Sequence, residues 1–248
     1  MKRRSLLAGL SAIAAGCAPR DDVRARGGYV VGSTATGVPF SFLDVKTNSL
    51  TGAMIDIAQA VARQAGFPVT LSVVPFSALI PSITARRIDV IAAAMLRTPE
   101  REQVVAFTDP VYAYGGAIVA RVEDARSYAA LADLQGLRVG AQVGTRFVEQ
   151  LQKAGVSGIK TYDSLADVLR DLRLGRLDAA YGDEPIIRYY LRVTRSAKLK
   201  LVDGYRAREL EEVCLVLRKA DPRLQAVNAA IGEIRATEIA AILRTWGL

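Results

Sequence analysis

A basic side chain in a helix-start motif follows a long apolar run of the chain. The run Ile88–Ala93 is almost continuously apolar, and Thr98-Pro99-Glu100-Arg101 comes shortly after it. Thr98 can cap a helix and Pro99 fits the first helical position, so Arg101 falls in the first turn of a short helix. A guanidinium there has the rigid fork of donors that binds a carboxylate in a bidentate way. The motif favours a carboxylate site at Arg101, with an ordinary surface arginine as the alternative.

A carboxylate occupies the matching place in the second half of the chain. Two segments match without a gap at an offset of 89 residues, and both end in Arg-Ile-Asp or Arg-Leu-Asp, at Asp89 and Asp178. This internal repeat predicts two βαβ lobes. Asp183 lies just past the carboxyl end of the predicted strand Leu177–Tyr181, as Arg101 lies past the end of Ile88–Ala93.

This arrangement suits a ligand that carries both charges. In parallel α/β sheets, ligands bind in the crevice at the carboxyl ends of the strands. If the two lobes face each other, Arg101 and Asp183 meet across one cleft and can hold the two ends of a zwitterion. The alternative is that the two side chains pair with each other or with their neighbours.

The elements that would position these groups alternate along the chain. Apolar and β-branched runs predict strands at Tyr29–Ser33, Val69–Val74, Ile88–Ala93, Leu137–Gln142, Ile159–Tyr162 and Leu177–Tyr181. Helical periodicity with start and stop signals predicts helices at Ala53–Ala65 and Phe76–Arg87, from Gly144-Thr145 to Gly155, and from Asp163 or Ser164 to Gly175.

Composition excludes several classes of protein. The chain has no histidine, which removes Ser-His-Asp and Cys-His catalysis and the commonest metal ligand. It has no phosphate loop and no dinucleotide fingerprint. The net charge of +8 falls to +5 without Lys2, Arg3 and Arg4 and is spread along the chain, so nucleic acid is not an expected partner. Cys214 lies in an apolar run and is expected in the core. Because we expect the other cysteine, Cys17, to be acylated, no intrachain disulfide and no cysteine metal site is expected.

The N-terminus has the pattern of an export signal. Lys2, Arg3 and Arg4 precede the apolar run Leu6–Ala15, which is too short to span a membrane, and Ala14-Ala15-Gly16-Cys17 resembles a bacterial lipobox. We therefore expect a signal peptide at 1–16, lipidation of Cys17 and a linker at 17–27. An ordinary secretory signal is the alternative, and the two arginines leave twin-arginine export open.

A set of motifs in a fixed order carries a resemblance to a known family. The set resembles the family 3 bacterial extracellular solute-binding proteins, the polar amino-acid receptors of ABC importers, from Gly28 to Leu248. It consists of Val38-Pro39-Phe40-Ser41-Phe42, Gly52 with Asp56-Ile57-Ala58, Phe76 with Leu79-Ile80-Pro81, Arg87-Ile88-Asp89-Val90-Ile91, Thr98-Pro99-Glu100-Arg101, Phe107-Thr108-Asp109-Pro110-Val111-Tyr112, Arg138-Val139-Gly140 with Gly144-Thr145, Tyr162-Asp163-Ser164-Leu165, Gly175-Arg176-Leu177-Asp178-Ala179-Ala180 with Asp183, and Leu217-Arg218-Lys219-Ala220-Asp221-Pro222.

The resemblance implies an α/β fold of the type II periplasmic-binding-protein clamshell. Each lobe would be a mostly parallel sheet flanked by helices. Lobe one would hold residues 28–114 and 216–248, and lobe two residues 115–215, with the crossing strands at its edges.

The resemblance also implies roles for single residues. Arg101 would bind the ligand α-carboxylate, Asp183 the α-ammonium, Phe76 would form an aromatic wall, and Thr145 at a helix start would contact the carboxylate. The chain departs from the family pattern at positions expected to line the same site, which are Thr34, Gly37, Ala93, Ala94, Leu96 and Arg146. Arg146 could reach a second anionic group of the ligand, pair with Asp183, or point to solvent.

These expectations define a binding protein rather than an enzyme. The chain would be an exported, lipid-anchored monomer of the periplasm or cell envelope. It would need no cofactor or metal, and would deliver an amino acid or related carboxylate to an ABC permease in the inner membrane. One alternative is a dehydratase of the cyclohexadienyl dehydratase type, with Glu184 as a conceivable proton donor. Another is a receptor that hands its ligand-bound form to a membrane sensor without transport.

Overall fold

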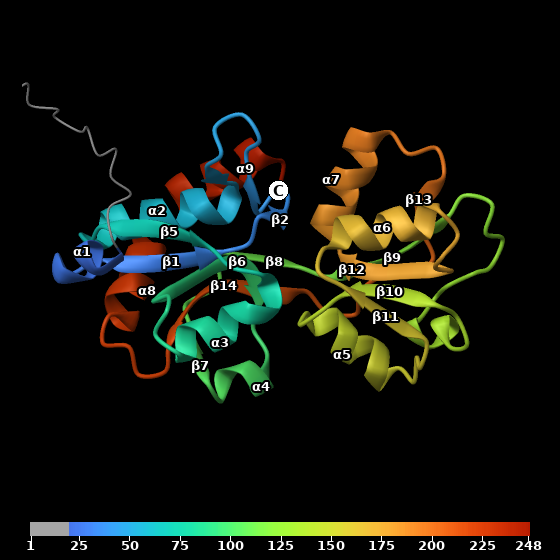
Figure 1. The fold of residues 1–248 in the computed structure, drawn as a ribbon, viewed down its shortest axis with the longest axis horizontal. Helices are drawn as coiled ribbons and strands as arrows, with labels where there is room; N and C mark the ends of the chain where they lie inside the picture. Colours follow the sequence, from blue (N-terminus) through green and yellow to red (C-terminus); the bar gives the residue numbers. More distant parts are fainter. Residues whose placement is uncertain (1–19) are drawn as a thin grey trace, which may run out of the picture.

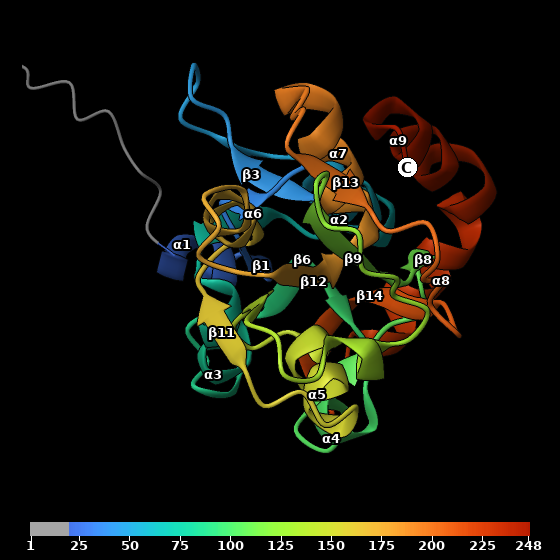
Figure 2. The same cartoon turned by 90° about the vertical axis from the view of Figure 1, so that its right-hand side faces the viewer.

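The strand and helix segments of the chain fold into two lobes, each built around its own sheet (Figure 1). The computed structural model describes residues 20–248, so the predicted signal peptide and Cys17 lie outside the described residues. Figure 2 looks along the line that joins the lobes, with the second lobe nearer the viewer. No helix within the described part of the chain is long and apolar enough to cross a bilayer.

Lobe one contains the larger sheet, in the order β5-β1-β6-β14-β7, with β8 also paired to β14. The first three strands run parallel, and β14 is antiparallel to β6, β7 and β8. Its strands are β1 (Tyr29–Ser33), β5 (Val69–Val73), β6 (Val90–Leu96), β7 (Val105–Phe107), β8 (Tyr112–Tyr114) and β14 (Glu211–Arg218). A small separate sheet, β2-β3-β4, consists of Thr36–Gly37, Ser41–Leu43 and Leu50–Thr51.

Lobe two repeats this plan in the order β11-β10-β12-β9-β13. Three parallel strands are again followed by an antiparallel one, β9, which pairs with β12 and β13. Its strands are β9 (Gly116–Arg121), β10 (Val139–Gln142), β11 (Ile159–Tyr162), β12 (Ala179–Asp183) and β13 (Leu199–Leu201). The chain therefore crosses between the lobes twice, from β8 to β9 and from β13 to β14.

Helices cover the sheets (Figure 1). Those of lobe one are α1 (Arg20–Ala25), α2 (Ala53–Ala65), η1 (Phe76–Ala78), α3 (Leu79–Thr84), α4 (Pro99–Glu102), α8 (Leu224–Ile234), η3 (Arg235–Ile239) and α9 (Ala240–Trp246). Those of lobe two are η2 (Leu131–Leu134), α5 (Arg146–Lys153), α6 (Leu165–Arg173) and α7 (Glu184–Thr194).

The 89-residue repeat has a structural basis in the two aspartates that end it. The amide of Asp89 donates to the carbonyl of Val30 at 2.7 Å, and the amide of Val30 donates back to the Asp89 carboxylate at 2.9 Å. Asp178 and Arg138 make the same reciprocal pair, at 2.8 and 2.9 Å. Each aspartate therefore ties the start of a central strand to its neighbour, and sets the position of the following strand end.

The strands that lead to the site end later than their sequence pattern predicts. β6 runs from Val90 to Leu96 rather than over Ile88–Ala93, and β12 runs from Ala179 to Asp183 rather than over Leu177–Tyr181. The aspartate turns delay both starts, and antiparallel partners extend both ends: Leu96 pairs with Val213, and Asp183 with Gly116. Cys214 is fully buried in β14, as expected.

Candidate functional site

Arg101 lies in the first turn of α4, where the helix-start motif places it. The Thr98 hydroxyl accepts the amide of Arg101 at 3.3 Å, and Pro99 is the first helical residue. The arginine is only 7% exposed. Its guanidinium donates to the Leu96 carbonyl at 2.6 Å and, across the lobes, to the Gly144 carbonyl at 3.0 Å. Burial lowers its pKa, and no carboxylate of the described chain pairs with it.

Asp183 is the last residue of β12 and is 8% exposed. The Tyr114 hydroxyl of β8 donates a hydrogen bond to its carboxylate. Burial raises the pKa of Asp183 to about 6, although the hydrogen bond from Tyr114 and the charge of Arg101 both act to lower it. Since the charge of Arg101 acts on Asp183 without an ion pair between them, the two groups lie near each other and are held by different neighbours.

A small cavity joins the two lobes beside these groups. It brings together six of the residues predicted for the site: Thr34, Gly37, Phe76, Ala94, Thr145 and Asp183. Ala93, also expected there from the family pattern, lines it as well. Its volume of about 20 Å³ holds about one water molecule, so an amino acid enters only if the lobes move apart.

The lobes meet closely where Gly144 faces Ser77. Gly144 has φ +75°, and a Cβ on it would lie 3.0 Å from the Ser77 Cα. Glycine is required here both by the backbone conformation and by the approach of lobe one. An exposed ion pair, Lys153 to Glu100 at 3.8 Å, spans the lobes nearby, between α5 and α4.

Three predicted site residues do not line this cavity. Arg101 lies near Asp183 but outside the lining. The Leu96 side chain packs in the core of lobe one, and only its carbonyl reaches the site, as an acceptor for Arg101. Arg146 forms ion pairs with Glu149 at 3.0 Å and with Glu211 of β14 at 2.9 Å. It lines a different cavity, of about 670 Å³, and neither pairs with Asp183 nor points freely to solvent.

Several lining residues were not among the predicted site residues. These are Phe40, Ser41, Gln142 and Ile186. The sequence could have indicated Ile186, because it follows Asp183 by three residues at a helix start and therefore lies on the same face of that helix. Tyr114, which holds Asp183, has no local signal, because the two are 69 residues apart and meet only in the folded chain.

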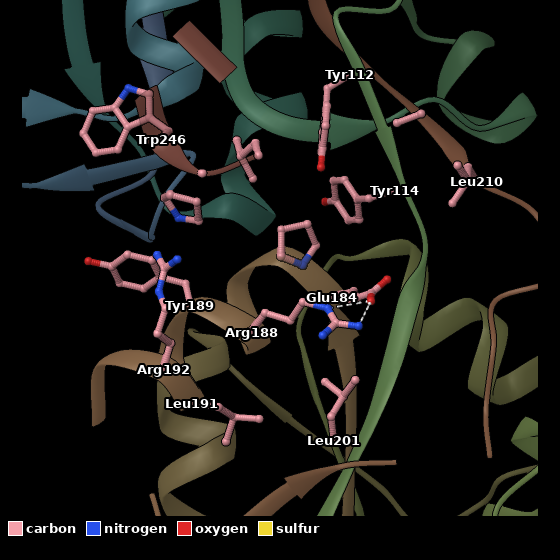
Figure 3. A pocket seen from close by; sticks show the side chains of 15 residues that line it. Tyr112, Tyr114, Glu184, Arg188, Tyr189, Leu191, Arg192, Leu201, Leu210 and Trp246 are labelled. Atoms are coloured by element: carbon pink, nitrogen blue, oxygen red, sulfur yellow. Dashed lines mark hydrogen bonds and ion pairs between the residues drawn. The ribbon is translucent and has the colours of Figure 1, made fainter. Parts of the chain in front are cut away.

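A larger cavity of about 640 Å³ is lined by residues of β8, α7 and the C-terminal end of α9 (Figure 3). Tyr112, Tyr189 and Trp246 line it. Glu184 faces this cavity, where Arg188 donates to its carboxylate at 2.7 Å. The Glu184 side chain is thus separated from the cavity that Asp183 lines.

Comparison with known proteins connects this geometry to a family. The family model described as "Bacterial extracellular solute-binding proteins, family 3" matches residues 29–248. ABC transporter arginine-binding protein 1 of Escherichia coli K12 is 33% identical over 163 residues, which is 65% of this chain and 65% of that protein. The matched region thus spans less than two thirds of that relative.

Solved structures match over a greater length. An ancestral arginine-binding protein bound to arginine has a TM-score of 0.82 and 32% identity, covering 89% of this chain and 98% of that chain. An ancestral amino acid-binding protein described as a precursor of cyclohexadienyl dehydratase has a TM-score of 0.80 and 28% identity, covering 91% and 98%. The two-lobed α/β fold is therefore that of amino-acid-binding proteins.

Proposed function

Because this chain belongs to the family 3 bacterial extracellular solute-binding proteins, we propose that it captures an amino acid, or a related carboxylate, between its lobes and delivers it to an ABC importer. One relative is named as an arginine-binding protein of an ABC transporter, and another as an L-cystine-binding protein. The proposal places the protein outside the cytoplasm.

One observation carries this proposal: a buried anion from lobe two lines the interlobe cavity, and a buried cation from lobe one lies near it and donates a hydrogen bond across the lobes. Burying an ionised group is costly unless it is paired. The Arg101 guanidinium has only carbonyl acceptors, and the Asp183 carboxylate has a phenol donor. A ligand α-carboxylate at Arg101 and α-ammonium at Asp183 would pair both charges at once.

Ligand binding would be coupled to closure. Arg101 already bonds to Gly144 of the other lobe, so a carboxylate bound at Arg101 would replace an existing interlobe contact with a stronger one. Contacts from one ligand to both lobes favour the closed arrangement, with hinging at the β8–β9 and β13–β14 crossings. The permease would then distinguish closed from open receptors.

The finer parts of the proposal rest on sequence motifs. Export and lipidation of Cys17 are supported by the lipobox-like Ala14-Ala15-Gly16-Cys17. A non-enzymatic role is supported by the binding-protein relatives and by Glu184, the conceivable acid of the dehydratase alternative, which is paired with Arg188 away from Asp183.

Calorimetric titration of the purified mature chain with the twenty common L-amino acids, at pH 7.5, tests the proposal. We expect at least one to bind, and Arg101→Ala to lower its affinity about 30- to 1000-fold, because the buried carboxylate would lose its partner. Arg63→Ala is the matched control, since Arg63 also lies in lobe one, pairs with Glu238 at the surface and does not line the cavity. Unchanged affinity in Arg101→Ala, or no binding by the wild type, would contradict the proposal.

A further inference from the structure

We infer that the interlobe cavity selects an amino acid whose side chain is uncharged. This inference rests on the proposed function and specifies its ligand. It differs from what similarity to arginine-binding relatives suggests, and it follows from the charges and hydrogen bonds of the residues around the cavity.

The charges at the site suffice for the ligand backbone and no more. Of the described residues that line the cavity, Asp183 alone carries a charge, and Arg101, outside the lining, lies near Asp183. The ligand ammonium and carboxylate would use both. A charged ligand side chain would therefore have to be buried without a counter-ion, which is costly.

A cationic side chain finds only weak acceptors. The hydroxyls of Thr34 and Ser41 line the cavity but lie 3.0 Å apart and hydrogen-bond to each other. The other polar lining groups besides Asp183 are Gln142 and Thr145. A guanidinium or ammonium would lose its hydration and gain no carboxylate in exchange.

An anionic side chain finds no spare donor with a positive charge. Arg146 pairs with Glu149 and Glu211 and lines a different cavity. The Gln142 amide already donates to the Asp163 carbonyl at 3.0 Å, and the Thr145 hydroxyl donates to the Gln142 carbonyl at 2.7 Å. These groups are held within lobe two and are not free to bind a carboxylate.

The rest of the lining is apolar or small. It consists of Gly37, Phe40, Phe76, Ala93, Ala94 and Ile186. A Cβ on Gly37 would lie at ordinary van der Waals distance, 3.5 Å from the Thr34 hydroxyl and 3.8 Å from Ile186. The glycine therefore leaves space for about one methyl group at this wall. Apolar walls with one hydroxyl pair match apolar or hydroxylated side chains.

The test ranks affinities within the same calorimetric panel, with citrulline added as the uncharged isostere of arginine. We expect the tightest ligand to have an uncharged side chain, at least 10-fold tighter than arginine, lysine, aspartate or glutamate. A charged amino acid that binds tightest would overturn the inference and leave the proposed function intact. Binding by none of the panel would overturn both.

A gain-of-function variant supplies a second test. Thr34→Asp places a carboxylate on the cavity wall and is expected to raise the affinity for arginine at least 10-fold but not the affinity for citrulline. Thr34→Asn, which has the shape of the aspartate without its charge, is the control and should not favour arginine over citrulline. Equal gains for arginine and citrulline with Thr34→Asp, or a gain for arginine over citrulline with Thr34→Asn, would overturn the inference.

Discussion

Tyr114 donates a hydrogen bond to the carboxylate of Asp183 and connects a strand of lobe one to the end of a central strand of lobe two. The Tyr114 ring also stacks on Phe40, with centroids 5.4 Å apart. Burial raises the pKa of Tyr114 well above its usual value, and the nearby charge of Asp183 raises it further, so the phenol remains a donor at physiological pH. The candidate anion is thus held by the segment that leads from lobe one to lobe two.

Tyr114→Phe is expected to weaken ligand binding about 3- to 30-fold at pH 7. Without the donor, the pKa of Asp183 rises above about 6 and less of the carboxylate is ionised. The loss should shrink at pH 9, where the carboxylate ionises fully. Calorimetry at both pH values measures this. Tyr112→Phe is the control, since the described structure gives the Tyr112 hydroxyl no hydrogen bond; equal effects of both variants would contradict the assignment.

Asp183→Asn is expected to stabilise the ligand-free protein at neutral pH. The pKa of Asp183 is about 6 in the folded protein, above its ordinary value of 3.8, because burial opposes its charge. The stability that the neutral carboxyl group of Asp183 gives the fold is thus fully present below pH 3.8 and is lost as the pH rises through about 6. At pH 7.5 the variant should gain about 1–3 kcal/mol in urea unfolding, and at pH 4 almost nothing.

Asp178→Asn should behave in the opposite way in the same measurement. Hydrogen bonding to Arg138 is the largest of the effects that lower the pKa of Asp178, to about 2. The ionised carboxylate therefore stabilises the fold above the ordinary pKa, and this is lost as the pH falls toward 2. Destabilisation by both variants at pH 7.5 would rule out a costly buried charge at Asp183.

Gly144→Ala is expected to hinder lobe closure. The new Cβ would lie 3.0 Å from the Ser77 Cα of lobe one, and backbone atoms there cannot easily move aside. Gly136→Ala is the control, because Gly136 has the same φ of +75° with nothing within 4 Å. Both variants should lose about 1 kcal/mol of stability. Only Gly144→Ala should lower ligand affinity, by about 10-fold in calorimetry; equal affinities would show that this contact does not limit closure.

Arg146→Gln is expected to affect stability more than binding. Arg146 forms ion pairs with Glu149 and Glu211. Without it, the Glu211 carboxylate at the start of β14 keeps only the hydrogen bond from the Gln150 amide. Ligand affinity should stay within about 3-fold while the melting temperature falls. A 100-fold loss of affinity at unchanged melting temperature would place Arg146 in the ligand site instead.

The sequence alone determined the features that depend on neighbouring residues. Thr98 and Pro99 start α4 and thereby place Arg101 in its first turn, shortly after the end of β6. The Arg-x-Asp endings at Asp89 and Asp178 mark two copies of one βαβ unit, because each aspartate closes the same reciprocal backbone pair. Two βαβ lobes, and the succession of their parallel strands along the chain, follow from such local signals.

Only the tertiary structure decided which side chains share a cavity. Arg146 follows Thr145 directly, yet Thr145 lines the interlobe cavity, while Arg146 is drawn to Glu211, 65 residues away. Glu184 follows Asp183 directly and faces another cavity. Tyr114 reaches Asp183 only because β8 and β12 end at the junction of the lobes. Local sequence patterns fix the type of these elements, whereas the exact strand ends and these pairings depend on contacts between segments brought together by folding.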